Sequence, residues 1–396
     1  MKPLRIGLVV PHIFMHREIL PNVIFSPARL ALTLANGLQS LGHEVTLYTP
    51  GPVETKAKKL TADLSYFERE LDGRGDNYLD LLKKHPFTFV TLARQVQSEL
   101  IANAYSAANR GELDIVHIYT NEEDIALPFA SFCQRPVVFT HHDPFNFLVK
   151  YKNVFPKYSY LNWISMSQAQ RQTMPLDTNW VGNIYHGLDK DQFTLNTHPN
   201  GRYIAYLGRI IESKGVHLAI AAVKKYNSNH PDSTYKLKIA GKHYAGSDKD
   251  NYWQTKILPQ IEKDIEYVGF IKDDSAKQDF LGNATALIVP SIFNEPFGMV
   301  LIEALACGTP VIGLNNGAIP EVITNNKTGI IVKNESTENE TITGLSAAIS
   351  RIEEIDRLLC RGAFESRFTL DRMVTEHLGV YQNLVVSSKK EKLQND

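Results

Sequence analysis

The chain has 396 residues, which is too many for one ordinary hydrophobic core and fits two domains of roughly 150–200 residues each. Hydrophobic residues make up 43% and charged residues 21%, as is usual for a globular protein, and the formal net charge of −1 provides no overall basic field for nucleic acid. The three cysteines form no CxxC pair and show no metal-ligand spacing, so they fit small buried side chains in a reducing compartment.

The first apolar run, at 4–10, is short and ends at a proline, which predicts a strand and not a signal peptide. No stretch of the sequence approaches the ~20 apolar residues of a membrane-spanning helix. We therefore expect a cytoplasmic protein, for which peripheral contact with a membrane surface is an open alternative.

Short β-rich runs alternate with helical stretches along the chain. We expect strands at 4–10, 44–49, 114–119, 136–140 and 162–167, and then at 203–208, 235–241, 265–270, 285–291 and 310–314. Between the first two runs, leucines at helical spacing from Leu30 to Leu41 predict a helix. Such alternation, occurring twice, is typical of parallel sheets with right-handed crossovers. The predicted fold class is α/β, with two Rossmann-like, doubly wound parallel-sheet domains that face a central cleft.

The domain boundaries follow from a change in composition. The segment 189–201 is polar and rich in Asn, Asp, Pro and Gly, and it predicts the linker between a first domain at 1–188 and a second domain at 202–369. We expect the C-terminal helix, about 370–388, to pack back on the first domain.

The strongest signal for a site lies in the second half, after the strand at 285–291. Pro296 and Gly298 suit the start of a helix, and Gly308 suits its end. We therefore expect a helix from about Phe297 to Cys307. Its free N–H groups would lie at the carboxyl edge of the sheet, where an anion binds well.

Two carboxylates frame this helix start. Glu295 precedes the helix, and Glu303 lies about two turns into it with a side chain tilted back toward the N-terminus. A continuous helix would hold them about 12 Å apart, too far to share a proton. They are thus placed to hold two different parts of one extended ligand. A ligand with a phosphate on the helix and hydroxyls on each glutamate is a nucleotide sugar. The alternative is one capping carboxylate and one buried, hydrogen-bonded glutamate.

Two cations follow the strand at 203–208. Arg209 and Lys214 should lie in a loop at the same edge of the sheet, where a guanidinium fork and a lysine point charge suit a diphosphate. The alternative is two solvated loop charges.

In their order along the chain, these segments resemble glycosyltransferase family 4, a group of retaining enzymes with the two-Rossmann-domain GT-B fold. Glu295 and Glu303 match the family's E-x7-E motif within EPFGMVLIEALACGTPVI, and LGRIIESKGV resembles its phosphate-binding loop. IYHGLD and PVVFTHHDPF resemble further segments of the family. The likeness covers nearly the whole chain and is strongest from Asn162 to Val332.

The resemblance implies roles for particular residues. Arg209 and Lys214 would hold the diphosphate, and Glu303 would bind the ribose hydroxyls. The catalytic residues would be Glu295, which binds hydroxyls of the transferred sugar, and His142, near the reacting centre. The backbone amides that would line the sugar and the phosphate belong to Phe297, Gly298, Met299 and Val300.

The resemblance also implies a reaction. A hexose-type sugar would move from a nucleotide diphosphate sugar to an acceptor with its anomeric configuration kept. UDP is the first choice of nucleotide, with GDP and ADP as alternatives, and the acceptor is an unidentified lipid, saccharide or small molecule. The sequence has no convincing DxD motif, so we expect no metal and no cofactor besides the donor substrate.

Two segments depart from the family's pattern. The family often carries a Gly-Gly loop after its first strand, whereas the connection at 11–29 contains no glycine. Its polar residues are His12, His16, Arg17, Asn22 and Ser26. Residues 51–112 predict an elaborated helical insertion, for which an acceptor-binding or membrane-facing element is the alternative.

Other functions remain as alternatives. A nucleotide-sugar epimerase or hydrolase uses a similar scaffold, and a non-catalytic nucleotide-sugar-binding protein would bind the same donor. A dinucleotide dehydrogenase fits poorly, because no GxGxxG follows a first strand in either half. The sequence leaves the oligomeric state open.

Overall fold

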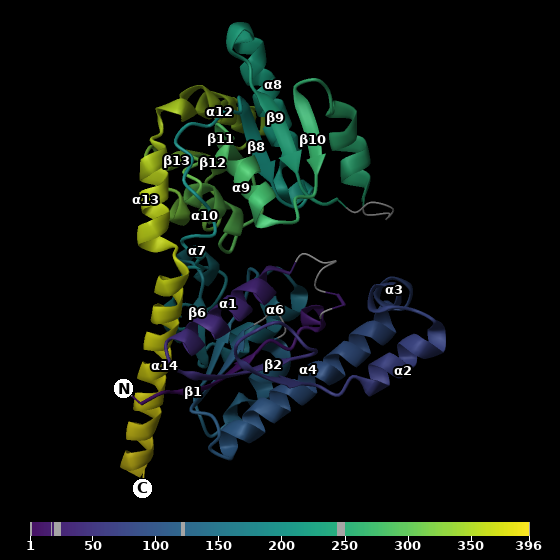
Figure 1. Ribbon diagram of the computed structural model, residues 1–396, viewed down its shortest axis with the longest axis vertical. Helices are drawn as coiled ribbons and strands as arrows, with labels where there is room; N and C mark the ends of the chain where they lie inside the picture. Colours follow the sequence, from purple (N-terminus) through teal and green to yellow (C-terminus); the bar gives the residue numbers. More distant parts are fainter. Residues whose placement is uncertain (1, 17, 20–24, 120–122, 244–249, 396) are drawn as a thin grey trace. The chain divides into compact units, whose positions relative to one another are not determined.

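The computed structural model describes residues 2–16, 18–19, 25–119, 123–243 and 250–395 (Figure 1). The chain forms two compact units. Unit 1 comprises Met1–Met166, Arg171–Ile184 and Leu370–Asp396, and unit 2 comprises Ser167–Gln170 and Tyr185–Thr369. The C-terminal segment therefore returns to the first unit.

Unit 1 is built on a seven-stranded, parallel sheet in the order β3-β2-β1-β4-β5-β6-β7. The strands are β1 (Arg5–Val9), β2 (Glu44–Thr49), β3 (Lys58–Thr61), β4 (Ile115–Tyr119), β5 (Val137–Thr140), β6 (Asn162–Ser165) and β7 (Trp180–Asn183). The order reverses between β1 and β4, as in a doubly wound sheet, where ligands bind beyond the carboxyl ends of the strands.

The helices of unit 1 cover this sheet. They are η1 (Ile13–Met15), α1 (Ser26–Ser40), α2 (Ser65–Arg74), α3 (Tyr78–Lys84), α4 (Pro86–Asn109), α5 (Glu123–Ala126), η3 (Leu127–Phe132), α6 (Val149–Val154), η4 (Phe155–Tyr158) and α14 (Leu370–Asn395). The short helix α7 (Gln168–Arg171) lies mostly in unit 2. α14 packs along α1 (Figure 1). The Val374 side chain fills the space beside Gly37. The segment 51–112 contains β3 as well as α2, α3 and α4, so it extends the sheet in addition to forming helices.

Unit 2 is built on a six-stranded, parallel sheet in the order β10-β9-β8-β11-β12-β13. The strands are β8 (Tyr203–Leu207), β9 (Lys236–Ala240), β10 (Ile265–Gly269), β11 (Ala286–Val289), β12 (Val311–Leu314) and β13 (Gly329–Val332). The order again reverses, here between β8 and β11. Both sheets thus have the doubly wound, Rossmann-like arrangement that the sequence predicts.

The helices of unit 2 connect these strands. They are η5 (Glu212–Lys214), α8 (Val216–Asn229), η6 (Pro231–Ser233), η8 (Trp253–Ile257), η9 (Leu258–Gln260), α9 (Asp274–Gly282), α10 (Met299–Ala306), α11 (Ile319–Val322), α12 (Glu338–Arg351), η10 (Ile352–Glu354) and α13 (Arg357–Arg367). The segment 189–201, expected as a linker, packs on this unit: the Thr194 amide donates to Gln278 Oε1 at 2.7 Å, and the Asn196 amide donates to the Cys307 carbonyl at 3.0 Å. Among the described residues, no helix has the length and apolar character needed to cross a membrane.

Candidate functional site

Two neighbouring strands of unit 2, β8 and β11, bring the predicted cations and the first glutamate to one edge of the sheet. The chain after β8 carries Arg209 and Lys214, and the chain after β11 carries Glu295. Residues 292–293 join the two loops, because both of their backbone amides donate to the Ser213 carbonyl at 3.0 Å. The carboxyl edge of this sheet is therefore the candidate site.

Lys214 and Glu295 form an ion pair at the centre of this edge. The Ser291 hydroxyl donates to the same Glu295 oxygen at 2.9 Å, and the Phe293 ring centroid lies 4.8 Å from Lys214 Nζ. Only 17% of the Lys214 side chain and 10% of the Glu295 side chain are exposed. Two donors thus hold the Glu295 carboxylate in one orientation, with its second oxygen left for a ligand hydroxyl.

The helix expected from Phe297 begins two residues later, since α10 starts at Met299. Gly298 precedes it with φ +92°, a left-handed conformation that favours glycine and that turns the chain into the helix. Within the part of the chain that the structure describes, no group accepts a hydrogen bond from the backbone N–H of residues 297–300. Four consecutive free amides at a helix N-terminus suit a phosphate or a sugar hydroxyl.

The Phe297 side chain is buried and does not share the free position of its backbone amide. It is 1% exposed, and its ring centroid lies 4.9 Å from that of His186 and 6.1 Å from that of Phe368. The side chain therefore belongs to the core of unit 2, and the backbone N–H is the part of this residue that can meet a ligand.

Glu303 lies in the first turns of α10 and is paired with a lysine that sequence reasoning missed. Lys277 Nζ, from α9, donates to Glu303 Oε1 at 2.7 Å, and the two side chains are 18% and 7% exposed. No signal in the sequence identifies Lys277, because its contact with Glu303 depends on how α9 packs against α10. The buried carboxylate needs such a cation, or several donors, once it is taken out of water. Each of the two glutamates thus has its own lysine.

Arg209 is the exposed cation of this edge. Its carbonyl accepts a hydrogen bond from the Tyr206 hydroxyl at 2.9 Å, which ties the loop to β8. Within the described ranges its guanidinium makes no hydrogen bond or ion pair. An unpaired guanidinium beside the Lys214–Glu295 pair can bind an anion without first breaking an internal contact.

His142 belongs to unit 1 and follows β5 by two residues. It is 9% exposed, and its ring packs against that of Tyr119, from the neighbouring strand β4, with 4.4 Å between centroids. Its neighbour His141 is fully buried among aromatic rings, with Tyr151 at 4.5 Å. His142 therefore lies at the carboxyl edge of the first sheet, whereas His141 packs in the core of unit 1.

His117 lies inside the core of unit 1. Its Nδ1 is 2.7 Å from the Tyr381 hydroxyl, and its Nε2 is 2.8 Å from Thr140 Oγ1. Burial, with a smaller effect of His377, holds the pKa of His117 well below its ordinary value. This histidine ties α14 to β4 and β5.

The glycine-free connection at 11–29 contributes two further histidines to unit 1. His12 Nδ1 accepts a hydrogen bond from the Phe14 amide at 3.1 Å and so begins η1. Burial, with a smaller effect of Lys150, lowers the pKa of His12 to about 4. Ser26 is the first residue of α1, and His16 is 5% exposed, with its ring 4.7 Å from that of Tyr78. Arg17 and Asn22, singled out in the same connection, lie outside the described residues.

No three His, Cys, Asp or Glu side chains come together as metal ligands anywhere in the described ranges. The charged residues of the candidate site include Arg209, Lys214, Lys277 and the two glutamates.

Two protein-family models match consecutive parts of the chain. The model described as Glycosyltransferase Family 4 matches residues 27–174, and the model described as Glycosyl transferases group 1 matches residues 189–357. The chain is also 24% identical over 368 residues to the phosphatidyl-myo-inositol mannosyltransferase of Mycolicibacterium smegmatis. This alignment covers 90% of this chain and 86% of that protein.

Solved structures show the same fold. Sucrose-phosphate synthase from Thermosynechococcus elongatus matches with a TM-score of 0.71 at 16% identity, over 97% of this chain and 100% of that one. The Anabaena protein HepE in complex with UDP-glucose matches with a TM-score of 0.62 at 16% identity, over 98% of this chain and 100% of that one. The chain therefore belongs to the glycosyltransferases of the family 4 type, with two Rossmann-like domains in the GT-B arrangement.

Proposed function

We propose that the chain is a retaining glycosyltransferase that moves a hexose from a nucleotide diphosphate sugar to a lipid, saccharide or small-molecule acceptor. The observation that carries this proposal is the Lys214–Glu295 pair beside four free amides of residues 297–300. A cation, a hydroxyl-binding carboxylate and a helix N-terminus at one sheet edge suit a phosphate joined to a sugar.

Each group has a role in donor binding. Arg209, exposed and unpaired among the described residues, would clamp the diphosphate together with Lys214. When the phosphate arrives, the Lys214 ammonium would share its protons between phosphate and Glu295. The carboxylate of Glu295 would then accept hydrogen bonds from the sugar hydroxyls. Glu303, held by Lys277, would accept hydrogen bonds from the two ribose hydroxyls.

In the transfer step, negative charge develops on the departing diphosphate. The bond between the anomeric carbon and the phosphate oxygen breaks, and the acceptor oxygen bonds to the same face of that carbon. The acceptor's proton passes to the departing phosphate oxygen. Arg209, Lys214 and the amides at 297–300 would stabilise the negative charge that develops on the diphosphate. In this proposal these groups supply the positive charge without a metal ion, and His142 of unit 1 meets the reacting sugar.

UDP is the first nucleotide to test. The solved structure of HepE holds UDP-glucose, and this likeness of fold supports the same base here. In a thermal-shift experiment with UDP, GDP, ADP and their glucose conjugates, a ligand at 100 times its Kd adds about 2.7 kcal/mol to the free energy of unfolding. A shift with one nucleotide supports the donor site and identifies the base. No shift with any of them contradicts the proposal.

Turnover separates transfer from the alternatives. A transferase consumes its donor fast only when an acceptor is present, whereas a hydrolase or an epimerase needs no acceptor. Proton NMR of the product reads the anomeric configuration, and an inverted product would contradict the retaining reaction. Activity that disappears with EDTA and returns with a divalent cation would contradict metal independence.

A further inference from the structure

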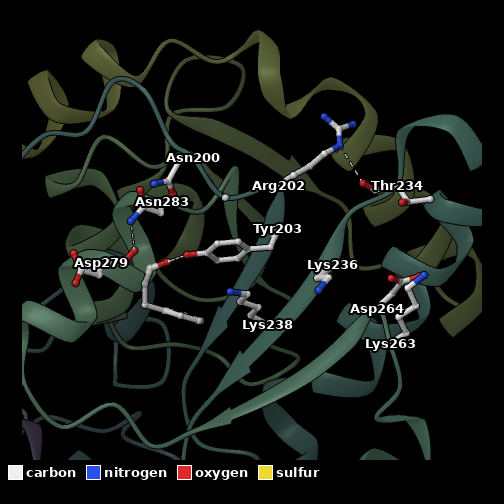
Figure 2. Close-up of a pocket in the computed structure, with 12 residues that line it drawn as sticks. Asn200, Arg202, Tyr203, Thr234, Lys236, Lys238, Lys263, Asp264, Asp279 and Asn283 are labelled. Carbon is white, nitrogen blue, oxygen red and sulfur yellow. Dashed lines mark hydrogen bonds between the residues drawn. The ribbon is translucent and has the colours of Figure 1, made fainter.

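Unit 2 has a polar cavity of about 780 Å³, which Figure 2 shows. It lies at the amino edge of the sheet, whereas the candidate donor site lies at the carboxyl edge. It is lined by residues at the amino ends of β8, β9 and β10, including Tyr203, Lys236 and Asp264. Arg209 and Lys214 follow the carboxyl end of β8, about 20 Å from Tyr203 at the rise of an extended strand. A ligand of this cavity would therefore not compete with a nucleotide at the donor site.

Three lysines give this cavity its positive charge. Lys236 and Lys238 are two residues apart on β9, so both project from one face of the sheet, while Leu237 between them is fully buried on the other face. Lys263 precedes β10 at the far wall (Figure 2). Among the described residues, none of the three ammonium groups forms a hydrogen bond or an ion pair. We name this feature the lysine cavity.

The walls of the lysine cavity are held in place. Lys238 Nζ lies 4.4 Å from the centroid of the Tyr203 ring, and the Tyr203 hydroxyl donates to the Phe280 carbonyl at 2.6 Å. Arg202 donates to the Thr234 carbonyl at 3.1 Å, so its guanidinium is part of the wall and not free for a ligand. The three lysines are the cations that remain available.

The lining also includes two carboxylates and the side-chain amide of Asn200. Asp279 lies on α9, Asp264 precedes β10 and Asn200 precedes β8, as Figure 2 shows. Within the described ranges, no side chain or amide donates to either carboxylate, and the Asn200 side chain forms no hydrogen bond. A long polyanion would meet repulsion from both acids. A small ligand with one phosphate and several hydroxyls would satisfy the lysines and the acids together.

We propose that the lysine cavity is a binding site for a sugar phosphate, separate from the donor site. Lys236, Lys238 and Lys263 bind its phosphate, and Asp264 and Asp279 accept hydrogen bonds from its hydroxyls. The volume lies within the range of about 300–1,000 Å³ that is usual for small-molecule sites. The proposal stands on this cavity alone and does not depend on the transfer reaction.

Isothermal titration of the full chain with glucose 6-phosphate, in a buffer free of phosphate, tests the site. We expect the parent to bind it, and the double variant Lys236→Gln/Lys238→Gln to bind it at least about tenfold more weakly. Lys327→Gln is the matched control, because Lys327 is also an exposed lysine of unit 2 without an ion pair in the described chain. No binding by the parent at millimolar ligand, or equal binding by the double variant, would overturn the proposal.

Two further arms separate the sources of binding. Lys214→Ala, or saturating UDP, should leave the affinity for glucose 6-phosphate unchanged, and a loss in either case would assign the binding to the donor site and overturn the proposal. Inorganic phosphate should bind more weakly than glucose 6-phosphate. Asp279→Asn should narrow the difference in affinity between the two ligands, because it removes repulsion of the phosphate and replaces a charged acceptor of hydroxyl hydrogen bonds by a weaker amide acceptor. Equal affinity of the parent for both anions would contradict sugar recognition.

Discussion

At the scale of single residues, the candidate donor site depends on two lysine–glutamate pairs with different surroundings. The Glu295 carboxylate is also held by Ser291, whereas Lys277 is the hydrogen-bond donor identified for Glu303. Glu295 of the first pair precedes the segment with free amides at 297–300, and Glu303 of the second pair lies within α10. Substitutions at the two pairs should therefore separate phosphate binding from ribose binding.

Lys214→Ala and Glu303→Gln should each weaken donor binding without unfolding the protein. Lys214→Ala removes a charge from the diphosphate, and Glu303→Gln replaces an acceptor of ribose hydroxyls, so we expect each to raise the donor Kd about tenfold or more. Titration calorimetry with the nucleotide identified by thermal shift measures this. Lys224→Ala is the control, because Lys224 lies on α8 in an exposed pair with Glu262. Either site variant matching the parent would show that the donor residues are wrongly assigned.

Lys277→Met should destabilise the fold, since it leaves the Glu303 carboxylate buried without its cation. We expect a loss of about 1–3 kcal/mol in the free energy of unfolding, measured by urea denaturation. Adding Glu303→Gln in the same chain should restore much of that loss, because a neutral amide costs less to bury than a carboxylate. A double variant as unstable as the single variant would show that Lys277 acts by packing and not by charge.

At the scale of elements, the central strands and the edge strand β10 could be predicted from the sequence, whereas the other three edge strands could not. β1, β2, β4, β5, β6 and β8 to β12 all lie within the runs expected from their apolar residues. The strands that were missed, β3, β7 and β13, all lie at an edge of a sheet. β3 consists of KKLT with no buried residue, which is how an edge strand protects its free side. Edge strands are half-paired, so their sequences carry a weaker pattern.

The part of the candidate site that depends on strand ends was predictable, and the part that depends on helix packing was not. The ends of strands placed Arg209, Lys214 and Glu295 at one edge, because parallel strands share their carboxyl edge. Lys277 was not predictable, since its contact with Glu303 depends on how α9 packs against α10. The start of α10 shifted by two residues because Gly298 takes a left-handed φ, which sequence alone does not specify at a glycine.

The loop that holds Glu295 depends on close backbone packing. Gly317 has φ +54°, and a Cβ there would lie 2.4 Å from the backbone nitrogen and oxygen of Glu295. Gly317→Ala should therefore displace this loop, with a loss of several kcal/mol in stability or a large loss of donor affinity. Gly362→Ala, in α13 with open space around it, should be neutral or stabilising by up to about 1 kcal/mol. Equal stability and donor affinity in the two variants would contradict the tight contact.

At the scale of the whole molecule, the two units bury polar groups of different kinds. Unit 2 buries lysine–glutamate pairs at its site, and unit 1 buries neutral histidines in its core. Burial lowers the pKa of His377 to about 4, as it does for His12, and holds that of His117 well below its ordinary value. These histidines connect η1, β4 and α14, so their protonation acts on the core of unit 1.

This difference predicts that mild acid destabilises unit 1 before unit 2. Between pH 6.5 and about 4 the unfolded chain protonates His12, His117 and His377, whereas the folded unit keeps them neutral. The stabilisation is therefore complete above pH 6.5 and falls as the pH drops, by about 1.4 kcal/mol per pH unit for each histidine. Pulse proteolysis in urea at pH 7 and pH 5, with the cut sites mapped by mass spectrometry, reports the stability of each unit. His377→Gln keeps a donor for the Met373 carbonyl and removes one titrating group. The free energy of unfolding of unit 1 should therefore fall less steeply with decreasing pH, by about 1.4 kcal/mol per pH unit. An equal loss in both units, or an unchanged slope in the variant, would show that the buried histidines do not govern the response to acid.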